Sequence, residues 1–327
     1  MKNKLALITG ISGQDGAYLA NFLINKNYKV IGLTRNIHKN NFIKLKFLNI
    51  EDKVQIEECD LLDLTSVIFI IKKYKPNEIY NLAAQSSVGT SFKQPIGTIN
   101  FNITSVINLL EAIRLESPNS KFYQASSSEM YGKVKDLPVS INTPMHPLSP
   151  YAISKVAAHW IVVNYRESYK LKTCNGVLFN HESILRSNNF FVKKVIYESV
   201  KNKNNPNWVL KVGNINIKRD FGFSPNYVEA MWLMLQQNIM NDFIICSGKS
   251  ITLRSIIEHV FLKLSISTSK IVIDDDLFRP TDIEDIFGDN SDAIKKLKWS
   301  PIENFYGILD LIIEEELKIQ NQNIDSN

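Results

Sequence analysis

The stretch KLALITGISGQDGAYLA, residues 4–20, decides the fold, because an apolar run leads directly into glycines at positions 10, 13 and 16. Glycine at these spacings lets the backbone turn tightly after a strand and approach a pyrophosphate closely. The helix that follows presents free N–H groups and the positive end of its dipole to the phosphates. A plain tight turn is the alternative. We predict a dinucleotide site made by Gly10, Gly13, Gln14, Asp15 and Gly16.

Short apolar runs and longer amphipathic segments alternate through the first half of the chain. Six runs predict buried strands, at residues 4–9, 29–34, 54–58, 78–82, 121–126 and 173–178. Four segments between them predict helices, at residues 16–26, 64–75, 98–116 and 150–169. Such alternation builds right-handed βαβ units on a parallel sheet that helices cover on both faces. The predicted fold class is α/β, a doubly wound parallel-sheet Rossmann domain with a smaller, mostly C-terminal α/β substrate-binding lobe.

The pattern becomes less regular beyond residue 178. Polar stretches predict loops at 187–189 and 201–207 and a frayed tail at 321–327. Further helices are predicted at 227–240, 253–264, 292–297 and 305–319, with a strand at 243–246. We predict a cofactor-binding domain at 1–178, to which 215–246 returns, and a substrate-binding lobe made of 179–214 and 247–327.

The amino-acid composition excludes several kinds of protein. The 327 residues are 44% hydrophobic and 22% charged, which is typical of globular proteins. The net charge of +5 comes from scattered Lys and Arg without a basic block, so we expect no nucleic-acid partner. The three cysteines are far apart, which predicts small buried side chains, no metal site and a reducing cytoplasm. We expect no membrane span and no signal peptide, because the apolar runs are too short.

Residues at the ends of the predicted strands indicate which cofactor is bound. Arg35 follows the second strand, where an enzyme that prefers NAD usually has a carboxylate. Because a guanidinium suits a 2′-phosphate, we predict NADP, although a solvated surface Arg is the alternative. The adenine is expected at Asp60 and Leu61, after the third strand. The nicotinamide half is expected at the small-residue segment after the fourth strand, with contacts from Leu82, Ala83, Ala84 and Ser86.

Tyr151 and Lys155 are four residues apart at the start of a predicted helix and so share one face. A neighbouring ammonium favours the phenolate and lowers a pKa that is ordinarily about 10. We therefore predict that Tyr151 is a general base for an alcohol and that Lys155 tunes it. Both are also expected to contact the cofactor.

Ser127 and Glu129 lie at the end of the fifth predicted strand, where ligands sit in sheets of this kind. The Ser127 hydroxyl is suited to hydrogen-bond a sugar oxygen. A plain alcohol dehydrogenase needs only Ser, Tyr and Lys, so Glu129 predicts a further proton abstraction beside a carbonyl. A solvated loop residue or a helix cap is the alternative for Glu129.

The chain resembles the GDP-mannose 4,6-dehydratase family of extended short-chain dehydrogenases/reductases. The resemblance rests on segments that span most of the sequence, including LITGISGQDGAYLA (7–20), FYQASSSEMYG (122–132), SPYAISK (149–155), VNYRESY (163–169), NGVLFNHES (175–183) and FRP (278–280). The glycine loop and the YxxxK spacing mark only the superfamily. The YRES and FNHES segments are more specific to the GDP-mannose branch.

The resemblance implies a redox-neutral loss of water from GDP-mannose, with hydride transfer through bound NADP and no net cofactor turnover. It implies cofactor contacts from His181 and Arg186. It also implies contacts to the GDP-sugar from Ser86, Glu129, Asn180, Lys194, Arg219 and Arg279, and a homodimer or homotetramer.

The chain departs from the family pattern at several positions. Ser127 stands where the family usually has Thr, and Asn36 stands where a second Arg usually follows Arg35. Residues 183–187 and 190–194 also differ and leave room for a modified hexose or a manno-heptose in the GDP-sugar substrate. A nucleotide-sugar epimerase, a 4-ketoreductase and a non-catalytic NADP-binding scaffold stay open as alternatives.

Overall fold

The structure is a computed structural model that describes residues 4–38, 42–302 and 304–325, with side chains as far as residue 321. Its strands are β1 (Leu5–Thr9), β2 (Lys29–Thr34), β3 (Val54–Glu58), β4 (Glu78–Asn81), β5 (Lys121–Ser127), β6 (Lys172–Leu178), β7 (Asn180–Glu182), β8 (Leu210–Val212), β9 (Lys218–Phe223), β10 (Phe243–Ile245), β11 (Ser250–Thr252) and β12 (Ile271–Ile273). Its α-helices are α1 (Gln14–Asn25), α2 (Ile43–Phe47), α3 (Leu64–Tyr74), α4 (Val88–Lys93), α5 (Pro95–Glu116), α6 (Pro150–Tyr169), α7 (Phe191–Asn202), α8 (Ser224–Gln236), α9 (Leu253–Lys263) and α10 (Phe305–Asp325).

A seven-stranded parallel sheet forms the larger part of the molecule, in the order β10-β6-β5-β4-β1-β2-β3. The strand order reverses between β1 and β4, and in such sheets a ligand crevice opens at that point, beyond the carboxyl ends of the strands. All seven predicted strands appear in this sheet. The predicted fold class, a doubly wound parallel α/β sheet, is confirmed.

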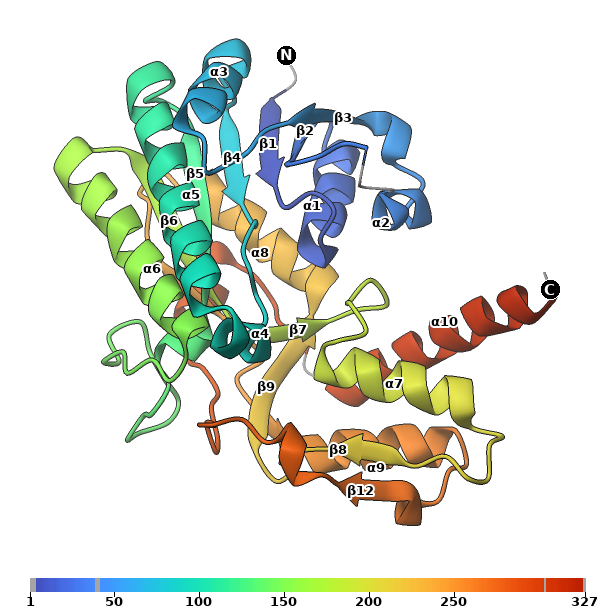
Figure 1. Ribbon diagram of the computed structural model, residues 1–327. Coiled ribbons are helices and arrows are strands. Elements are labelled where there is room, and N and C mark those ends of the chain that lie inside the picture. The colour runs from blue at the N-terminus through green and yellow to red at the C-terminus, as the bar shows by residue number, and fades with distance from the viewer. Residues whose placement is uncertain (1–3, 39–41, 303, 326–327) are drawn as a thin grey trace.

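Helices cover both faces of this sheet (Figure 1). On one face, α3, α5 and α6 enclose an apolar cluster that includes Leu7, Val106 and Val162. On the other face, α1 and α8 pack against a second cluster with Ile8 and Met231. By length and composition alone α5 resembles a membrane span, but half of its apolar window is buried in the structure, as expected of a core helix.

A second lobe packs around its own apolar core. It contains a three-stranded sheet in the order β11-β9-β7, a two-stranded sheet of β12 and β8, and the helices α7, α9 and α10. Ile196, Val260 and Ile312 are buried between these helices. Within residues 215–246, β10 joins the large sheet and α8 packs on it, whereas β9 pairs with β7 and β11. The domain boundaries stay a prediction.

Three elements of the second lobe differ from the sequence-based prediction. The helix α7 was not predicted, although its buried residues recur at helical spacing. The helix predicted at 292–297 is a π-helix over Ala293–Leu297. The predicted frayed tail is wrong as far as Asp325, because α10 continues to that residue, and residues 326–327 lie outside the description. A buried ion pair between Glu316 and Lys193 of α7 holds α10 in place.

Candidate active site

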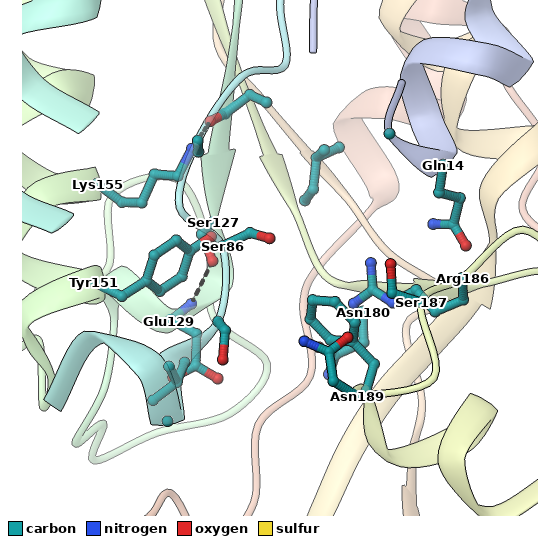
Figure 2. Close-up of a pocket in the computed structure, with 18 of the residues that line it drawn as sticks. Gln14, Ser86, Ser127, Glu129, Tyr151, Lys155, Asn180, Arg186, Ser187 and Asn189 are labelled. Atoms are coloured by element: carbon teal, nitrogen blue, oxygen red, sulfur yellow. Dashed lines mark hydrogen bonds between the residues drawn. The ribbon is translucent and has the colours of Figure 1, made fainter. Parts of the chain in front are cut away.

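A cavity of about 880 Å³ opens at the carboxyl ends of β1, β4 and β5. One wall comes from the glycine loop, the segment after β4, the end of β5 and the start of α6. The opposite wall comes from residues 178–191 and 276–280. Figure 2 shows Ser127, Glu129 and Tyr151 on one side and Asn180, Arg186 and Asn189 on the other.

The glycine loop makes a turn that only glycine allows. Gly10 has a φ of +70°, and a Cβ there would lie 2.9 Å from the Ala83 nitrogen. A Cβ at Gly16 would lie 2.3 Å from the Gly10 carbonyl oxygen. That oxygen accepts a hydrogen bond of 2.9 Å from the Gly13 N–H. The first turn of α1 is thereby brought to the cavity wall with its N–H groups directed into it.

Tyr151 and Lys155 both line the cavity and are almost fully buried. The Lys155 ammonium donates a hydrogen bond of 2.8 Å to the Ala125 carbonyl and lies 5.9 Å from the centre of the Tyr151 ring. Burial lowers the pKa of Lys155 to about 8. Burial also raises the pKa of Tyr151 to about 12, with the Ser127 hydroxyl acting in the opposite direction. The predicted lowering of the Tyr151 pKa is therefore wrong for this structure, because burial outweighs the hydrogen bond from the Ser127 hydroxyl.

Ser127 and Glu129 lie on the same side of the cavity as Tyr151 (Figure 2). The Ser127 hydroxyl accepts a hydrogen bond of 3.3 Å from the Glu129 N–H, so the two side chains are held at the start of one turn. Glu129 is half-buried, and its carboxylate belongs to the cavity lining. A hydroxyl, a phenol and a carboxylate thus converge on one space, as the sequence predicted for proton transfer to and from a sugar.

His181 joins the two walls. Its Nδ1 lies 2.7 Å from the Phe179 carbonyl oxygen and its Nε2 lies 2.8 Å from the Asp15 carboxylate. Both partners are acceptors, so the two ring nitrogens of His181 face a carbonyl oxygen and a carboxylate. Burial alone would raise the pKa of Asp15, but the charge and hydrogen bond of His181 hold it well below its usual range. The second lobe is thereby tied to the first turn of α1, with Ser224 also donating to Asp15 at 2.8 Å.

Arg186 supplies a positive group at the same end of the cavity. Its guanidinium stacks 3.7 Å from the centre of the Phe190 ring. Its buried Nε finds no hydrogen-bond partner among the described residues, and the Glu182 carboxylate is 3.6 Å away. The Arg186 side chain lines the cavity, and a guanidinium suits the oxygens of a phosphate. The glycine loop, His181 and Arg186 therefore fit the phosphates of a dinucleotide.

The structure brings most of the predicted site residues to this one cavity. Those that line it are Gly10, Gly13, Gln14, Asp15, Gly16, Leu82, Ala83, Ala84, Ser86, Ser127, Glu129, Tyr151, Lys155, Asn180, His181, Arg186 and Arg279. They come from three strand ends, two helix starts and two segments of the second lobe. The convergence supports the predicted roles of these residues, which stay predictions.

Five predicted site residues lie outside the described lining, namely Arg35, Asp60, Leu61, Lys194 and Arg219. Four of them have a local reason. Arg35 is exposed after β2, Asp60 accepts from the Leu62 N–H, and Leu61 is buried in the core. Arg219 donates to the Asp282 carboxylate at 2.7 Å and to the carbonyls of Lys218 and Ile283. Their contacts to ligands stay predictions.

The cavity also contains residues that the sequence did not single out. Lys44 of α2 donates a hydrogen bond of 3.2 Å to the Ser12 carbonyl in the glycine loop, and both residues line the cavity. Lys93 at the end of α4 and Asn189 before α7 also line it. Ser12 was within reach of sequence reasoning, since it lies inside the glycine loop. Lys44 carried no such signal, because it follows a segment without clear periodicity.

Comparison with known proteins agrees with the motifs. Residues 7–311 match the model of a family described as GDP-mannose 4,6 dehydratase. The chain is 40% identical to GDP-mannose 4,6 dehydratase 1 of Arabidopsis thaliana, over 97% of this chain and 90% of the relative. It is 38% identical to the GDP-mannose 4,6 dehydratase of Homo sapiens, over 98% and 93%.

Among solved structures, the dTDP-glucose 4,6-dehydratase of Streptomyces venezuelae, whose structure contains NAD, is similar with a TM-score of 0.85. The similarity covers 95% of this chain and 96% of that one, at 18% identity, and it shows the shared fold alone. The family match, which includes the glycine loop, Glu129 and Tyr151, and the identities over nearly the whole length agree with each other. The chain therefore belongs to the GDP-mannose 4,6 dehydratase family.

Proposed function

We propose that this protein is a GDP-mannose 4,6-dehydratase that uses bound NADP. The observation that carries the proposal is the convergence of Ser127, Glu129 and Tyr151 on the cavity that the glycine loop also lines. An epimerase or a 4-ketoreductase needs the serine, tyrosine and lysine but has no evident use for a carboxylate at position 129. Relatives named as GDP-mannose 4,6 dehydratases at 36–41% identity support the same choice.

A nicotinamide cofactor, when bound, supplies the acceptor and later the donor of one hydride. Tyr151 accepts the proton of the sugar 4-hydroxyl, while Ser127 donates a hydrogen bond to the 4-oxygen. The resulting ketone acidifies the proton on carbon 5. Glu129 removes that proton and passes it to the departing 6-hydroxyl, which leaves as water. Hydride return to carbon 6 would then leave carbon 5 to accept the proton from Tyr151, so the protein ends the cycle in the protonation state in which it began.

The test is to incubate purified protein with GDP-mannose and a substoichiometric amount of NADP and to weigh the product by mass spectrometry. We expect a product lighter by one water, without lasting accumulation of reduced cofactor. A product of unchanged mass would favour an epimerase instead, and stoichiometric NADPH consumption would favour a 4-ketoreductase. Activity with GDP-manno-heptose but not with GDP-mannose would assign the heptose as substrate.

NADP is proposed over NAD because Arg35, and not a carboxylate, follows β2. Arg186 lines the same cavity as the glycine loop and adds a positive charge to it. Affinity measurements with both cofactors test the choice. The cytoplasm is proposed as the compartment, in line with three free, buried cysteines.

A homodimer or homotetramer is proposed from the outer faces of α5 and α6. These neighbouring helices expose large apolar side chains, among them Ile96 at 84%, Ile153 at 47% and Trp160 at 57%. Exposed apolar side chains on two neighbouring helices favour a protein partner, and a second copy would present the same face. Light scattering of the protein and of Trp160→Arg tests this, since the variant should dissociate.

A further inference from the structure

Lys44 is a basic side chain at the cofactor end of the cavity to which neither the predicted mechanism nor the sequence motifs assign a role. It belongs to α2, a short helix that packs beside α1. Its ammonium donates to the Ser12 carbonyl oxygen at 3.2 Å and so touches the glycine loop itself. The side chain is half-buried and lines the same cavity as Gly10, Ser12 and Gly13.

Lys44 lies among charged groups whose carboxylates are already engaged, since Glu182 is 3.6 Å from Arg186. Burial lowers the pKa of Lys44, the Asp15 carboxylate acts in the opposite direction, and the Arg186 guanidinium lowers it further. Asp15 is already engaged by His181, Gln14 and Ser224. Two cations that interact unfavourably beside a helix N-terminus are relieved by an anion between them.

Arg35 does not line the cofactor end of the cavity. It is exposed after β2 and lies outside the lining, whereas Lys44 comes back to the loop from the next helix. A lysine ammonium is a compact charge with three N–H donors, of which one reaches the Ser12 carbonyl. A phosphate that rests on the start of α1 would meet the same ammonium.

We propose that Lys44 binds a phosphate group of the dinucleotide cofactor. The inference rests on the proposed function only in requiring a dinucleotide, and not on the identity of the sugar. The phosphate is either the diphosphate that bridges the two nucleosides, present in NAD and NADP alike, or the 2′-phosphate found in NADP alone.

The experiment measures binding of NADPH and of NADH to the full-length protein, without sugar, by fluorescence titration. The variants are Lys44→Ala and Lys44→Gln, with Lys46→Ala as the matched control, since Lys46 lies on the same short helix and is exposed. A charge-assisted hydrogen bond contributes enough that its loss should weaken binding about 10-fold to 100-fold. Gln keeps a donor for the Ser12 carbonyl but not the charge, so Lys44→Gln should be weakened and Lys44→Arg should restore binding.

Weaker binding of both cofactors assigns the diphosphate, and weaker binding of NADPH alone assigns the 2′-phosphate. Wild-type affinity of Lys44→Ala for both, or an equal loss in Lys46→Ala, overturns the proposal. So does full affinity in Lys44→Gln, because the Ser12 contact alone would then explain the residue. If the wild-type protein binds a dinucleotide but dehydrates no GDP-sugar, the proposed function fails while the assignment of Lys44 still stands or falls on these titrations.

Discussion

The two walls of the cavity are built in different ways. The wall on the large sheet presents Ser127, Glu129 and Tyr151 from strand ends and a helix start that follow one another along the chain. The opposite wall presents His181, and that side chain reaches Asp15 across 166 residues of sequence. The first wall depends on local turns of the chain, and the second depends on contacts between distant segments. Variants in the wall on the large sheet should therefore slow the chemical steps. Variants in the opposite wall should weaken ligand binding or lower stability.

The largest effect is expected from Tyr151→Phe in the sheet wall. Loss of the proton acceptor should lower kcat by about 10²-fold to 10⁴-fold while cofactor affinity is retained. Steady-state kinetics and a cofactor titration measure both. Tyr131→Phe is the matched control, because the Tyr131 hydroxyl is buried without a described partner and lies outside the lining. Comparable losses in both variants would argue that Tyr151 acts through packing rather than proton transfer.

Glu129→Gln should separate the two halves of the proposed reaction. Oxidation at carbon 4 can proceed without the carboxylate, but removal of the carbon 5 proton cannot, so water loss should fall by about 10²-fold or more. Reduced cofactor should then accumulate on the enzyme in a single turnover, which its absorbance reports. Tyr151→Phe should show no such accumulation. Reduced cofactor in neither variant would exclude the assigned order of steps.

Arg219 and Arg279 allow a buried arginine of the second lobe to be compared with a more exposed one. Arg219 is 5% exposed and bonds Asp282, whereas the side chain of Arg279 is 40% exposed and lies 3.7 Å from the same carboxylate. Arg219→Leu should lower the free energy of unfolding by about 3 kcal/mol, because it leaves buried acceptors unpaired. Arg279→Leu should leave stability nearly unchanged and raise KM for the GDP-sugar. Chemical denaturation and kinetics of both variants test this, and equal destabilisation would contradict it.

Lys155→Met should lower the activity but raise the free energy of unfolding at pH 7. Burial lowers the Lys155 pKa from its ordinary 10.5 to about 8. At pH 7 the ammonium therefore still carries its charge, and folding has to bury that charge. The wild type should gain stability as pH rises from about 8 towards 10, since the unfolded chain then binds the extra proton. The variant lacks this cost and should be more stable at pH 7 by about 3 kcal/mol, with the difference shrinking at higher pH. Denaturation at several pH values checks the sign, and a constant difference would rule out the titration of Lys155 as its cause.

The sequence predicted the sheet wall well because its signals are local. All seven strands of the large sheet were identified, and the glycine loop, Ser127, Glu129 and Tyr151 follow from their position at strand ends or a helix start. The second lobe was harder to predict. Its strands β7, β8, β11 and β12 have three residues each, too few to show an alternation, and α7 begins after a polar stretch that suggested only a loop.

What the sequence by itself determined is the fold class, the cofactor loop and the likeness to a family, since each depends on residues close together in the chain. Only the tertiary structure decided that Lys44 rather than Arg35 reaches the glycine loop, and that Arg219 bonds Asp282. It also decided that burial raises the Tyr151 pKa above its ordinary value. The physical reason is common to all three. Burial, charge and hydrogen-bond partners are set by segments that meet only after folding, and no local periodicity encodes which side chains will meet.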